Sequence, residues 1–458
     1  MQAEFKILAP TAILGYGFPI KSFEAGLTES PDIIAVDGGS TDPGPYYLGS
    51  GKSFTDREAV KRDLRLIIRG SQKLDIPVLV GTAGGSGANS HLNWTEEIVQ
   101  ELASEEGWNL KVALIGSQFD KEYLKRKLTA DEISPLAPAA EIKAADIDNS
   151  TNIVGQMGIE PIMEVLDTKP DVVLCGRAYD PTVFAAPAIK AGFKPGLAFH
   201  LGKILECASI AADPGSGSDC MLGTLKEDSF ILKPLNQKRR CTVTSVAAHT
   251  LYEKADPYHL TGPGGEIDLT DTEFKAISDR EVEVKGSKFI PAETYTIKLE
   301  GAELVGYRTI SLAGVRDPIM ISQLDDILDS IRAMVRDNFD DLNEDDYQLI
   351  FKKYGQDGVM GELEPNRDQP VNYELGLVIE AIAKTQELAD TICSFTRSSL
   401  LHYGYKGRKA TAGNLAFPYS PSDFRGGEVY SFSLHHLLEV DDPIKPFNAE
   451  IREFKGGN

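Results

Sequence analysis

The first half of the chain alternates short apolar runs with longer amphipathic segments. Residues 32–39 (DIIAVDGG) form a short apolar run that ends in glycines, as a buried strand does. In residues 53–72, Val60, Leu64 and Ile67 recur at helical spacing. This spacing predicts a helix that begins at a capping box of Thr55 and Glu58 and ends near Gly70.

The same order of elements continues along the chain. Residues 75–87 read as a strand and a glycine loop, and residues 93–108 as a helix with Asn93 and Glu96 in capping-box register. Further strands are predicted within 110–117 and 158–181, and further helices within 181–193 and 201–213. Strands alternating with helices predict an α/β fold, a mostly parallel sheet with helices on both faces.

The pattern changes after about residue 240. Residues 241–253 fit either a strand or the start of a helix, whereas residues 280–289 and 294–315 alternate with period two, as antiparallel strands do. We interpret 321–339 as an amphipathic helix, 347–355 as a strand, 372–404 as a long helix and 427–440 as a late strand. The order from about residue 295 onward predicts a smaller C-terminal ferredoxin-like α+β domain.

We therefore expect three regions. Residues 1–240 would form an α/β ligand-binding or catalytic domain, residues 241–294 a connector with strands, and residues 295–458 the ferredoxin-like domain. A chain of 458 residues is too long for one ordinary core, which agrees with more than one domain.

Net charge, apolar stretches and cysteine content indicate which partners and which cellular compartment to expect. The net charge of −22 disfavours nucleic acid and anionic membrane surfaces. No apolar stretch is long enough to span a bilayer, and the first residues lack the pattern of a signal peptide. Five cysteines without CxxC spacing indicate reduced thiols, so we expect a cytoplasmic protein without a zinc site.

Glycine-rich loops follow the predicted strands. Asp37–Gly44, Gly81–Ala88 and Gly176–Pro181 would lie at the carboxyl edge of the sheet, and the segment 214–223 is a weaker candidate. Such loops bring backbone N–H groups close to an anion, although tight turns need glycine for geometry alone. Neither a P-loop nor an NAD fingerprint is present. The predicted ligand-binding residues are Gly38, Gly39, Ser40, Thr41, Thr82, Gly84, Gly85, Ser86, Gly87 and Asp180.

Three side chains in these loops are candidates for catalysis. Asp37 and His91 suit proton transfer, and Arg177 suits a bidentate contact with a carboxylate. Each has a structural alternative: an Asx turn for Asp37, a cap for His91 and an internal ion pair with Asp180 for Arg177. Asp37 and Asp42 together would also suit a divalent metal ion.

Other polar residues are weaker candidates. Cys220 lies in a Gly/Ser loop without a local base, and Cys207 fits simple packing. His435 and His436 would point to opposite faces of a strand and so make a poor chelating pair. Residues that would reach a ligand from the second domain, or pack domains together, are Arg408, Asn414 and Ser422.

Five long motifs resemble one known family. They are DGGSTDPGPYYLGSG, GTAGGSGANSHL, GRAYDPTVFAAPAI, LGKILECASIAADPGSGSDCMLGTL and AGNLAFPYSPSD. The chain resembles the acyclic terpene utilisation protein AtuA family over most of its length. The resemblance implies an N-terminal α/β domain followed by a ferredoxin-like one, and a setting in terpene degradation through CoA thioesters. It implies no set of catalytic residues.

Two functional hypotheses follow. The first is a catabolic lyase, hydratase or isomerase that acts on a small carboxylic acid or an acyl-CoA ligand, with the glycine loops stabilising developing negative charge. The second is a non-catalytic metabolite-binding or scaffold subunit of a catabolic complex, which the missing nucleophile and nucleotide motifs favour. A nucleotide-dependent ligase or kinase is disfavoured because the P-loop lysine is missing. A homo-oligomer is expected in either case, because ferredoxin-like domains often pair subunits.

Overall fold

The computed structural model describes residues 3–252, 256–343, 345–367, 369, 373–409 and 412–457. Residues 253, 372, 410 and 411, which belong to segments interpreted above, lie outside this description. The chain forms two compact units: unit 1 is Met1–Glu303 with Phe432–Asn458, and unit 2 is Leu304–Ser431. The units divide the chain at other positions than the predicted boundaries at residues 240 and 295, because residues 241–294 pack within unit 1.

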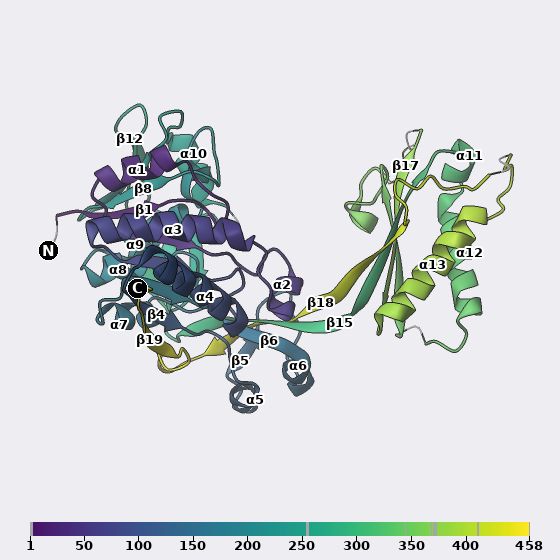
Figure 1. Ribbon diagram of the computed structural model, residues 1–458, viewed down its shortest axis with the longest axis horizontal. Helices are drawn as coiled ribbons and strands as arrows, with labels where there is room; N and C mark the ends of the chain where they lie inside the picture. The colour runs from purple at the N-terminus through teal and green to yellow at the C-terminus, as the bar shows by residue number, and fades with distance from the viewer. Residues whose placement is uncertain are drawn as a thin grey trace. The chain divides into compact units, whose positions relative to one another are not determined.

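Unit 1 is built on a ten-stranded mixed sheet (Figure 1). Its centre is parallel, as predicted, in the order β1 (Phe5–Ala9), β2 (Ile33–Asp37), β3 (Val78–Gly81), β7 (Val172–Cys175) and β4 (Leu110–Ile115). The flanking strands are antiparallel: β8 (Met221–Leu225), β9 (Ser229–Pro234), β13 (Val282–Lys285) and β12 (Glu273–Ala276) beside β1, and β19 (Ala449–Phe454) beside β4.

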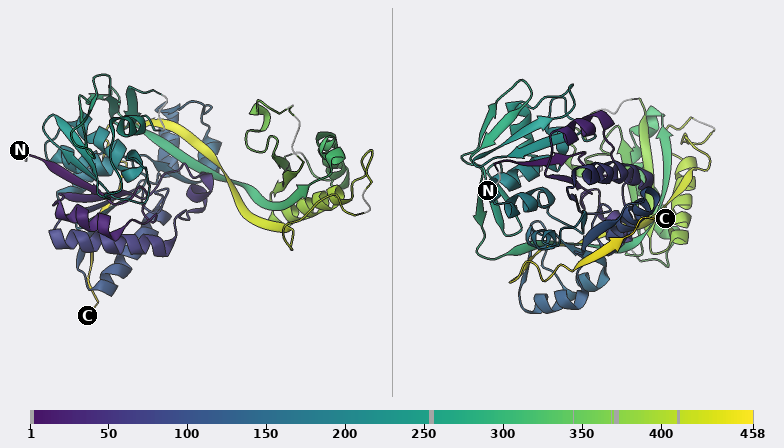
Figure 2. Two further views of the ribbon diagram at one scale, coloured as in Figure 1. Left: turned by 90° about the horizontal axis from the view of Figure 1, so that it is seen from above. Right: turned by 60° about the vertical axis from the view of Figure 1, so that its left-hand side comes forward.

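Helices cover both faces of this sheet, as the alternating pattern predicts. Within β2, Ile34 and Val36 belong to one apolar core and Ile33 and Ala35 to the other, because successive side chains of a strand point to opposite faces. One face carries α1 (Ile20–Thr28), α3 (Arg57–Leu74) and α4 (Asn89–Glu106), and the other carries α7 (Glu160–Leu166), α8 (Thr182–Lys190) and α9 (Pro195–Leu205). The left view of Figure 2 shows the two layers, purple and blue helices below and teal ones above.

The remaining elements of unit 1 surround this core. A small antiparallel sheet consists of β10 (His259–Gly262), β11 (Gly265–Asp268) and β14 (Lys288–Pro291), and it packs against α9. The segment 241–253, which fits two interpretations, forms α10 (Val243–Thr250). The other short elements are α2 (Pro45–Ser50), α5 (Lys121–Thr129), β5 (Ile133–Pro135), α6 (Ala144–Asn149), β6 (Ser150–Gly155) and a 3-10 turn (Ala208–Ala211).

Two predicted helix starts are wrong by a few residues. The N-cap of α3 is Asp56 rather than Thr55, since the Asp56 carboxylate accepts a hydrogen bond from the N–H of Ala59. Helix α4 begins at Asn89, one turn before the expected capping box at Asn93, because the glycine loop turns directly into the helix.

The predicted end of the first helix near Gly70 is also wrong. Helix α3 continues to Leu74 and ends at Asp75 in the left-handed conformation. Gly70 lies inside it, where an added Cβ would come within 2.9 Å of the ring of Phe23. The glycine is therefore explained by the close packing of α3 on α1, not by the helix terminus.

Unit 2 contains helices and antiparallel strands. Strands β15 (Thr296–Val315) and β18 (Asp423–Glu439) each contribute one part to unit 1 and one to unit 2. The order within unit 2 is β15, α11 (Pro318–Ile321), α12 (Leu324–Asn338), β16 (Tyr347–Tyr354), a 3-10 turn (Gly361–Leu363), β17 (Leu375–Ala383), α13 (Gln386–His402) and β18. The strands lie in the order β16-β17-β15-β18, and α12 and α13 share one apolar core with them.

The long helix predicted for residues 372–404 is wrong in its first part. Residues 375–383 form the inner strand β17, and the helix starts only after Thr385, whose side chain accepts a hydrogen bond from the N–H of Leu388. In LGLVIEAIA, Leu377 and Ile379 share an apolar core with the helices, at every second position as in a strand. Because most of the run is apolar, the period-two pattern is hard to distinguish from an apolar helix in the sequence.

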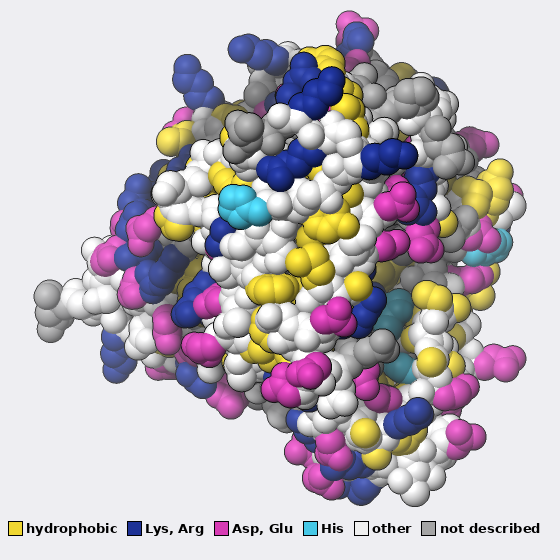
Figure 3. All heavy atoms as spheres, turned by 90° about the vertical axis from the view of Figure 1, so that its right-hand side faces the viewer, with side chains coloured by type: hydrophobic (Ala, Val, Ile, Leu, Met, Phe, Trp, Pro, Cys, Tyr) yellow, Lys and Arg dark blue, Asp and Glu magenta, His cyan; other side chains and the backbone are white. Residues whose placement is uncertain are grey.

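The helices and the distribution of surface charge bear on whether a segment of the chain could span a membrane. Among the described residues, none of the helices combines the length and apolar character needed to cross a bilayer. On the face shown in Figure 3, acidic and basic side chains are interspersed around scattered apolar ones. The negative net charge is therefore not gathered into one patch on that face.

Candidate functional site

The structure brings together the three glycine loops at the carboxyl edge of the parallel strands. The N–H of Gly38 donates to the carbonyl oxygen of Gly81 at 2.7 Å, which joins the loops after β2 and β3. The N–H of Ala83 donates to Cys175 at 2.8 Å, and that of Arg177 to Gly87 at 3.2 Å, which joins the loops after β3 and β7. Parallel strands in register place their following loops side by side.

The glycines allow the loops to approach one another closely. An added Cβ at Gly87 would lie 2.1 Å from the backbone nitrogen of Arg177, and Gly87 has a φ of +70°. An added Cβ at Gly38 would lie 2.8 Å from the oxygen of Gly81. Loop-to-loop packing therefore accounts for these two glycines, and the N–H of Gly38 is already used within the protein.

Asp37, the last residue of β2, is a buried carboxyl group with an unsatisfied oxygen. Its side chain is only about 5% exposed, and Oδ1 has no hydrogen-bond partner among the described residues. Burial raises its pKa well above 3.8, and the neighbouring Asp180 and Glu206 raise it further, against the lowering effect of Arg177 and the N–H of Gly39. The raised pKa favours the protonated form of Asp37 over a fixed anion.

Arg177, just after β7, is the centre of a group of buried ion pairs. Its Nε lies 2.7 Å from Oε2 of Glu300, and its Nη1 lies 3.0 Å from Oδ1 of Asp180. Nη1 also donates to the carbonyl oxygen of Ala178 at 2.8 Å and to Oγ1 of Thr82 at 3.4 Å. The internal Arg177–Asp180 pair weighed as an alternative is thus present.

Glu300 on β15 connects this arginine to the loop after β2. Its Oε1 accepts a hydrogen bond from Oγ1 of Thr41 at 2.7 Å and lies 2.8 Å from Nζ of Lys298. Burial would raise the pKa of Glu300, but Arg177 and Lys298 outweigh it and hold that pKa at about 2. Thr41, predicted to bind a ligand, here fixes a carboxylate.

A second ion pair comes from α9 and its C-terminus. Lys203 and Glu206 form a salt bridge, and both side chains are buried. Although burial opposes ionisation, Glu206 and Asp180 raise the pKa of Lys203 above its usual range. Sequence reasoning missed Lys203, Lys298 and Glu300. The available signal for Lys203 was a lone charge in an apolar helix, PGLAFHLGKIL.

We call these side chains the buried charge cluster, and it is balanced in sign. Three cations face three anions, and they are Arg177, Lys203 and Lys298 with Asp180, Glu206 and Glu300. An ionised Asp37 would add a negative charge without a matching cation. Burial first, and then the nearby anions Asp180 and Glu206, therefore raise the pKa of Asp37.

His91 takes the contacts of a helix cap. Its Nδ1 accepts from the N–H of Ala88 at 3.2 Å, and its Nε2 lies 3.1 Å from the carbonyl oxygen of Lys52. The ring is fully buried, and burial lowers the pKa of His91. Both nitrogens of the neutral ring are engaged, so its predicted catalytic role gains no support from these contacts.

The remaining predicted residues differ in burial. Ser86 is fully buried, and its Oγ, like Oδ1 of Asp37, has no hydrogen-bond partner among the described residues. Ser40 donates to the exposed carboxylate of Asp42 at 2.8 Å. Gly85 donates its N–H to the oxygen of Thr82 at 3.1 Å, and Gly84, like Gly39, has a positive φ that favours glycine.

The structure does not favour the metal site considered for Asp37 and Asp42. Asp37 is buried, whereas Asp42 is exposed. Within the described part of the chain, no three histidine, cysteine, aspartate or glutamate side chains cluster as metal ligands would. A hard cation such as Ca²⁺ needs about six or more oxygen ligands, far more than these two carboxylates supply.

The weaker candidates make local contacts. Cys220 is buried, and burial and Asp219 raise the pKa of its thiol, which disfavours a reactive thiolate. Nε2 of the buried His436 lies 3.0 Å from the oxygen of Ala140. Asn414 in unit 2 donates to the oxygens of Leu400 and Tyr403. The other two candidates of unit 2 also bond locally, Arg408 to Ala412 and Ser422 to Asp423.

Comparisons with known proteins gave one match. Residues 63–215 and 226–419 match the family described as "Acyclic terpene utilisation family protein AtuA". The matched ranges make up well over half of the chain and include Arg177, Glu300 and the loop after β3. The comparison with curated proteins and that with solved structures gave no match.

Proposed function

Because the chain belongs to the acyclic terpene utilisation AtuA family, we propose that it is an enzyme of acyclic terpene utilisation. Its substrate is a small carboxylic acid or the CoA thioester of one, and its reaction is of the lyase, hydratase or isomerase type. One observation carries this proposal: Asp37 is a buried carboxyl group with a raised pKa, near a charge-balanced cluster, and its Oδ1 has no hydrogen-bond partner among the described residues.

Asp37 is the proposed general acid. Its proton passes to the acyl oxygen or carbon of the ligand where negative charge develops, and the carboxylate takes a proton back when the step is reversed. A raised pKa suits this role, because it lets the group keep its proton to higher pH and release it to a stronger base.

Arg177 is the proposed positioning residue. It holds Asp180 and Glu300 in fixed ion pairs, and its backbone joins the loop that carries Gly87. A preorganised cluster of this kind sets the field at Asp37 without moving during the reaction. Ser86, buried with an unpartnered hydroxyl, is the neighbouring group best suited to donate a hydrogen bond to the ligand.

The proposal is tested by incubating the pure protein with panels of acyl-CoA thioesters and hydroxy acids and identifying products by mass spectrometry. With a substrate in hand, Asp37→Asn is expected to lower kcat by about 100-fold or more, the usual contribution of a general acid. Asp37→Glu should keep part of the activity. Asp279→Asn, which changes an exposed carboxylate, is the matched control.

Two outcomes would decide against the proposal. Unchanged turnover in Asp37→Asn would remove Asp37 from the chemistry. Saturable binding without any product, with or without a partner protein, would instead support the alternative of a metabolite-binding or scaffold subunit.

The proposal extends to unit 2 and to the setting of the protein. The order β-α-β-β-α-β, with β17 and β15 as inner strands, supports a ferredoxin-like unit, and such units commonly pair subunits. We expect a homo-oligomer, which light scattering would measure. Cys175, Cys220, Cys241 and Cys393 are free, which supports a reducing, cytoplasmic setting.

A further inference from the structure

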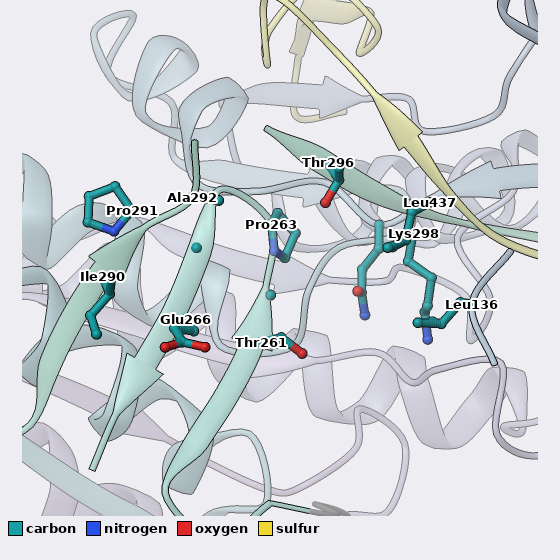
Figure 4. Close-up of a pocket in the computed structure, with 13 residues that line it drawn as sticks. Leu136, Thr261, Pro263, Glu266, Ile290, Pro291, Ala292, Thr296, Lys298 and Leu437 are labelled. Atoms are coloured by element: carbon teal, nitrogen blue, oxygen red, sulfur yellow. The ribbon is translucent and has the colours of Figure 1, made fainter. Parts of the chain in front are cut away.

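A separate pocket of about 490 Å³ lies within unit 1, between the small sheet and the unit 1 ends of β15 and β18. Figure 4 shows β10, β11 and β14 on one side of it, with Thr296 and Lys298 of β15 on the other. Its volume lies in the range of small-molecule sites. None of the residues predicted from the sequence to bind a ligand lines it.

Most of the pocket wall is apolar. Ile290 on β14 has about 43% of its surface exposed and lines the pocket, so part of its aliphatic side chain is open to a ligand. The apolar lining consists of Leu136, Pro263, Ile290, Pro291, Ala292 and Leu437. A hydrocarbon chain laid against this wall would remove both surfaces from water.

The two charged residues of the wall lie apart. Lys298 projects from β15, whereas Glu266 lies on β11, with Pro263 between them (Figure 4). Glu266 is already engaged, since its Oε1 lies 3.2 Å from Nδ1 of His259. Nζ of Lys298 lies 2.8 Å from Oε1 of Glu300, and this contact uses one of the three donors of the ammonium group.

From this arrangement we propose that the pocket binds a medium-chain monocarboxylate. Its carboxylate accepts hydrogen bonds from Lys298, and its hydrocarbon chain runs past Pro263 toward Ile290. The placement keeps the anion away from Glu266 and the chain on the apolar wall. The inference goes beyond the proposed chemistry, because such binding requires neither turnover nor Asp37.

The test uses octanoate as the probe and the full-length protein, with binding measured by isothermal titration calorimetry. We expect saturable binding of octanoate, at least about tenfold tighter than that of octylamine, which has the opposite charge, or of butyrate, which has too short a chain. Equal binding of octanoate and octylamine, or no saturable binding of octanoate, would overturn the proposal.

Substitutions at lysine residues test whether Lys298 binds the carboxylate end of the ligand. Lys298→Gln is expected to weaken octanoate at least about tenfold and to remove its advantage over octylamine. Lys288→Gln, at an exposed lysine of β14 that does not line the pocket, should leave binding unchanged. If it weakens octanoate as much as Lys298→Gln does, the assignment to Lys298 is wrong.

A third variant guards against a folding defect in Lys298→Gln, whose lysine is paired with a buried carboxylate. Ala292→Phe adds a ring from an exposed position of the wall and leaves every ion pair of the cluster in place. We expect it to exclude octanoate while the urea midpoint of unfolding stays within error of the wild type. Undiminished octanoate binding in Ala292→Phe would contradict the placement of the hydrocarbon chain.

Discussion

Unit 1 contains two groups of ion pairs with the same chemistry in opposite surroundings. The buried charge cluster lies at the carboxyl edge of the sheet, with Arg177 only about 2% exposed. The second group connects α3 and α4 on the surface. It consists of Arg57–Glu101, Lys61–Glu101, Lys61–Glu105, Arg65–Glu105, Arg65–Glu106 and Arg69–Glu106, at distances from 2.6 to 3.0 Å.

Distances alone do not distinguish the two groups, but solvent does. In the α3–α4 group Lys61 is about 12% exposed and the other side chains are about 22–46% exposed, so water competes for most of these charges, and an exposed pair contributes at most about 1 kcal/mol. In the cluster, Arg177, Lys203, Glu206 and Glu300 are at most about 5% exposed, whereas Asp180 and Lys298 are about 22% and 24% exposed, so removing a buried partner leaves a charge that water solvates poorly. The difference teaches that burial, rather than the number of pairs, determines what each pair does.

The largest effect is expected for Arg177→Met. The substitution leaves Asp180 without its partner and Glu300 with Lys298 alone, so the free energy of unfolding should fall by about 3–5 kcal/mol. Urea unfolding at neutral pH measures it. The double variant Arg177→Met with Asp180→Asn should recover part of the loss, because the carboxylate left without a partner is gone. A loss below about 1 kcal/mol would show that water reaches the cluster.

The next effect is the pH dependence that Asp37 confers. Its folded-state pKa is raised, so its contribution is complete below its ordinary value of 3.8 and is lost as pH rises through the folded pKa. Each unit of pKa elevation corresponds to about 1.4 kcal/mol. Asp37→Asn cannot ionise, so the wild type should lose stability relative to it as pH rises. Parallel stability curves from about pH 4 to about pH 9 would contradict the raised pKa.

A smaller effect is expected for Glu380→Gln in unit 2. Glu380 is about 3% exposed, but its partners Arg308 and Lys352 are about 35% and 45% exposed. Removing the carboxylate therefore leaves cations that water still solvates, and we expect a loss of about 1.5 kcal/mol. Urea unfolding measures it, with Glu387→Gln at an exposed position as the control. A loss as large as that of Arg177→Met would mean that partner exposure is unimportant.

The smallest effect is expected for Glu101→Gln on α4. Hydrogen bonds from Arg57 and then Lys61 lower the pKa of Glu101 to about 2. Its contribution is present above the ordinary value of 4.5 and is lost as pH falls toward 2. Because its side chain is about 44% exposed, the loss at neutral pH should stay below about 1 kcal/mol and shrink in high salt. A larger, salt-independent loss would remove the contrast with the cluster.

Much of the fold could be predicted because local patterns determine it. The apolar run before Asp37 and the spacing of Val60, Leu64 and Ile67 gave a strand and a helix that the structure contains. The strand β17 was missed because an apolar run before a helix fits both the strand period of two and the helix period of about 3.6. Its pairing with β15 and β16 is long-range, so no nearby residue indicates it. The N-cap of α3 lies one residue, and the start of α4 one turn, from the predicted position, although their capping contacts are local.

The candidate site was predictable only where glycines followed strands. Asp37 and Arg177 were found because parallel strands share one edge, a rule that applies from sequence order alone. Glu300 and Lys298 were missed because they come from β15, far away in the chain, and no local pattern links them to Arg177. His91 illustrates the opposite failure, since its residue type suggests chemistry that its buried contacts do not favour.

The sequence by itself determined the alternation of strands and helices, the parallel centre of the sheet and the glycine loops at its edge, because each depends on neighbours within a few residues. Only the tertiary structure decided which charges share a low-dielectric interior. The pKa of Asp37 is raised by burial and then by Asp180 and Glu206, against Arg177, and folding brings these groups together from distant segments. Electrostatic energy depends on the distance between charges and on their exposure to water, and the order of residues along the chain determines neither directly.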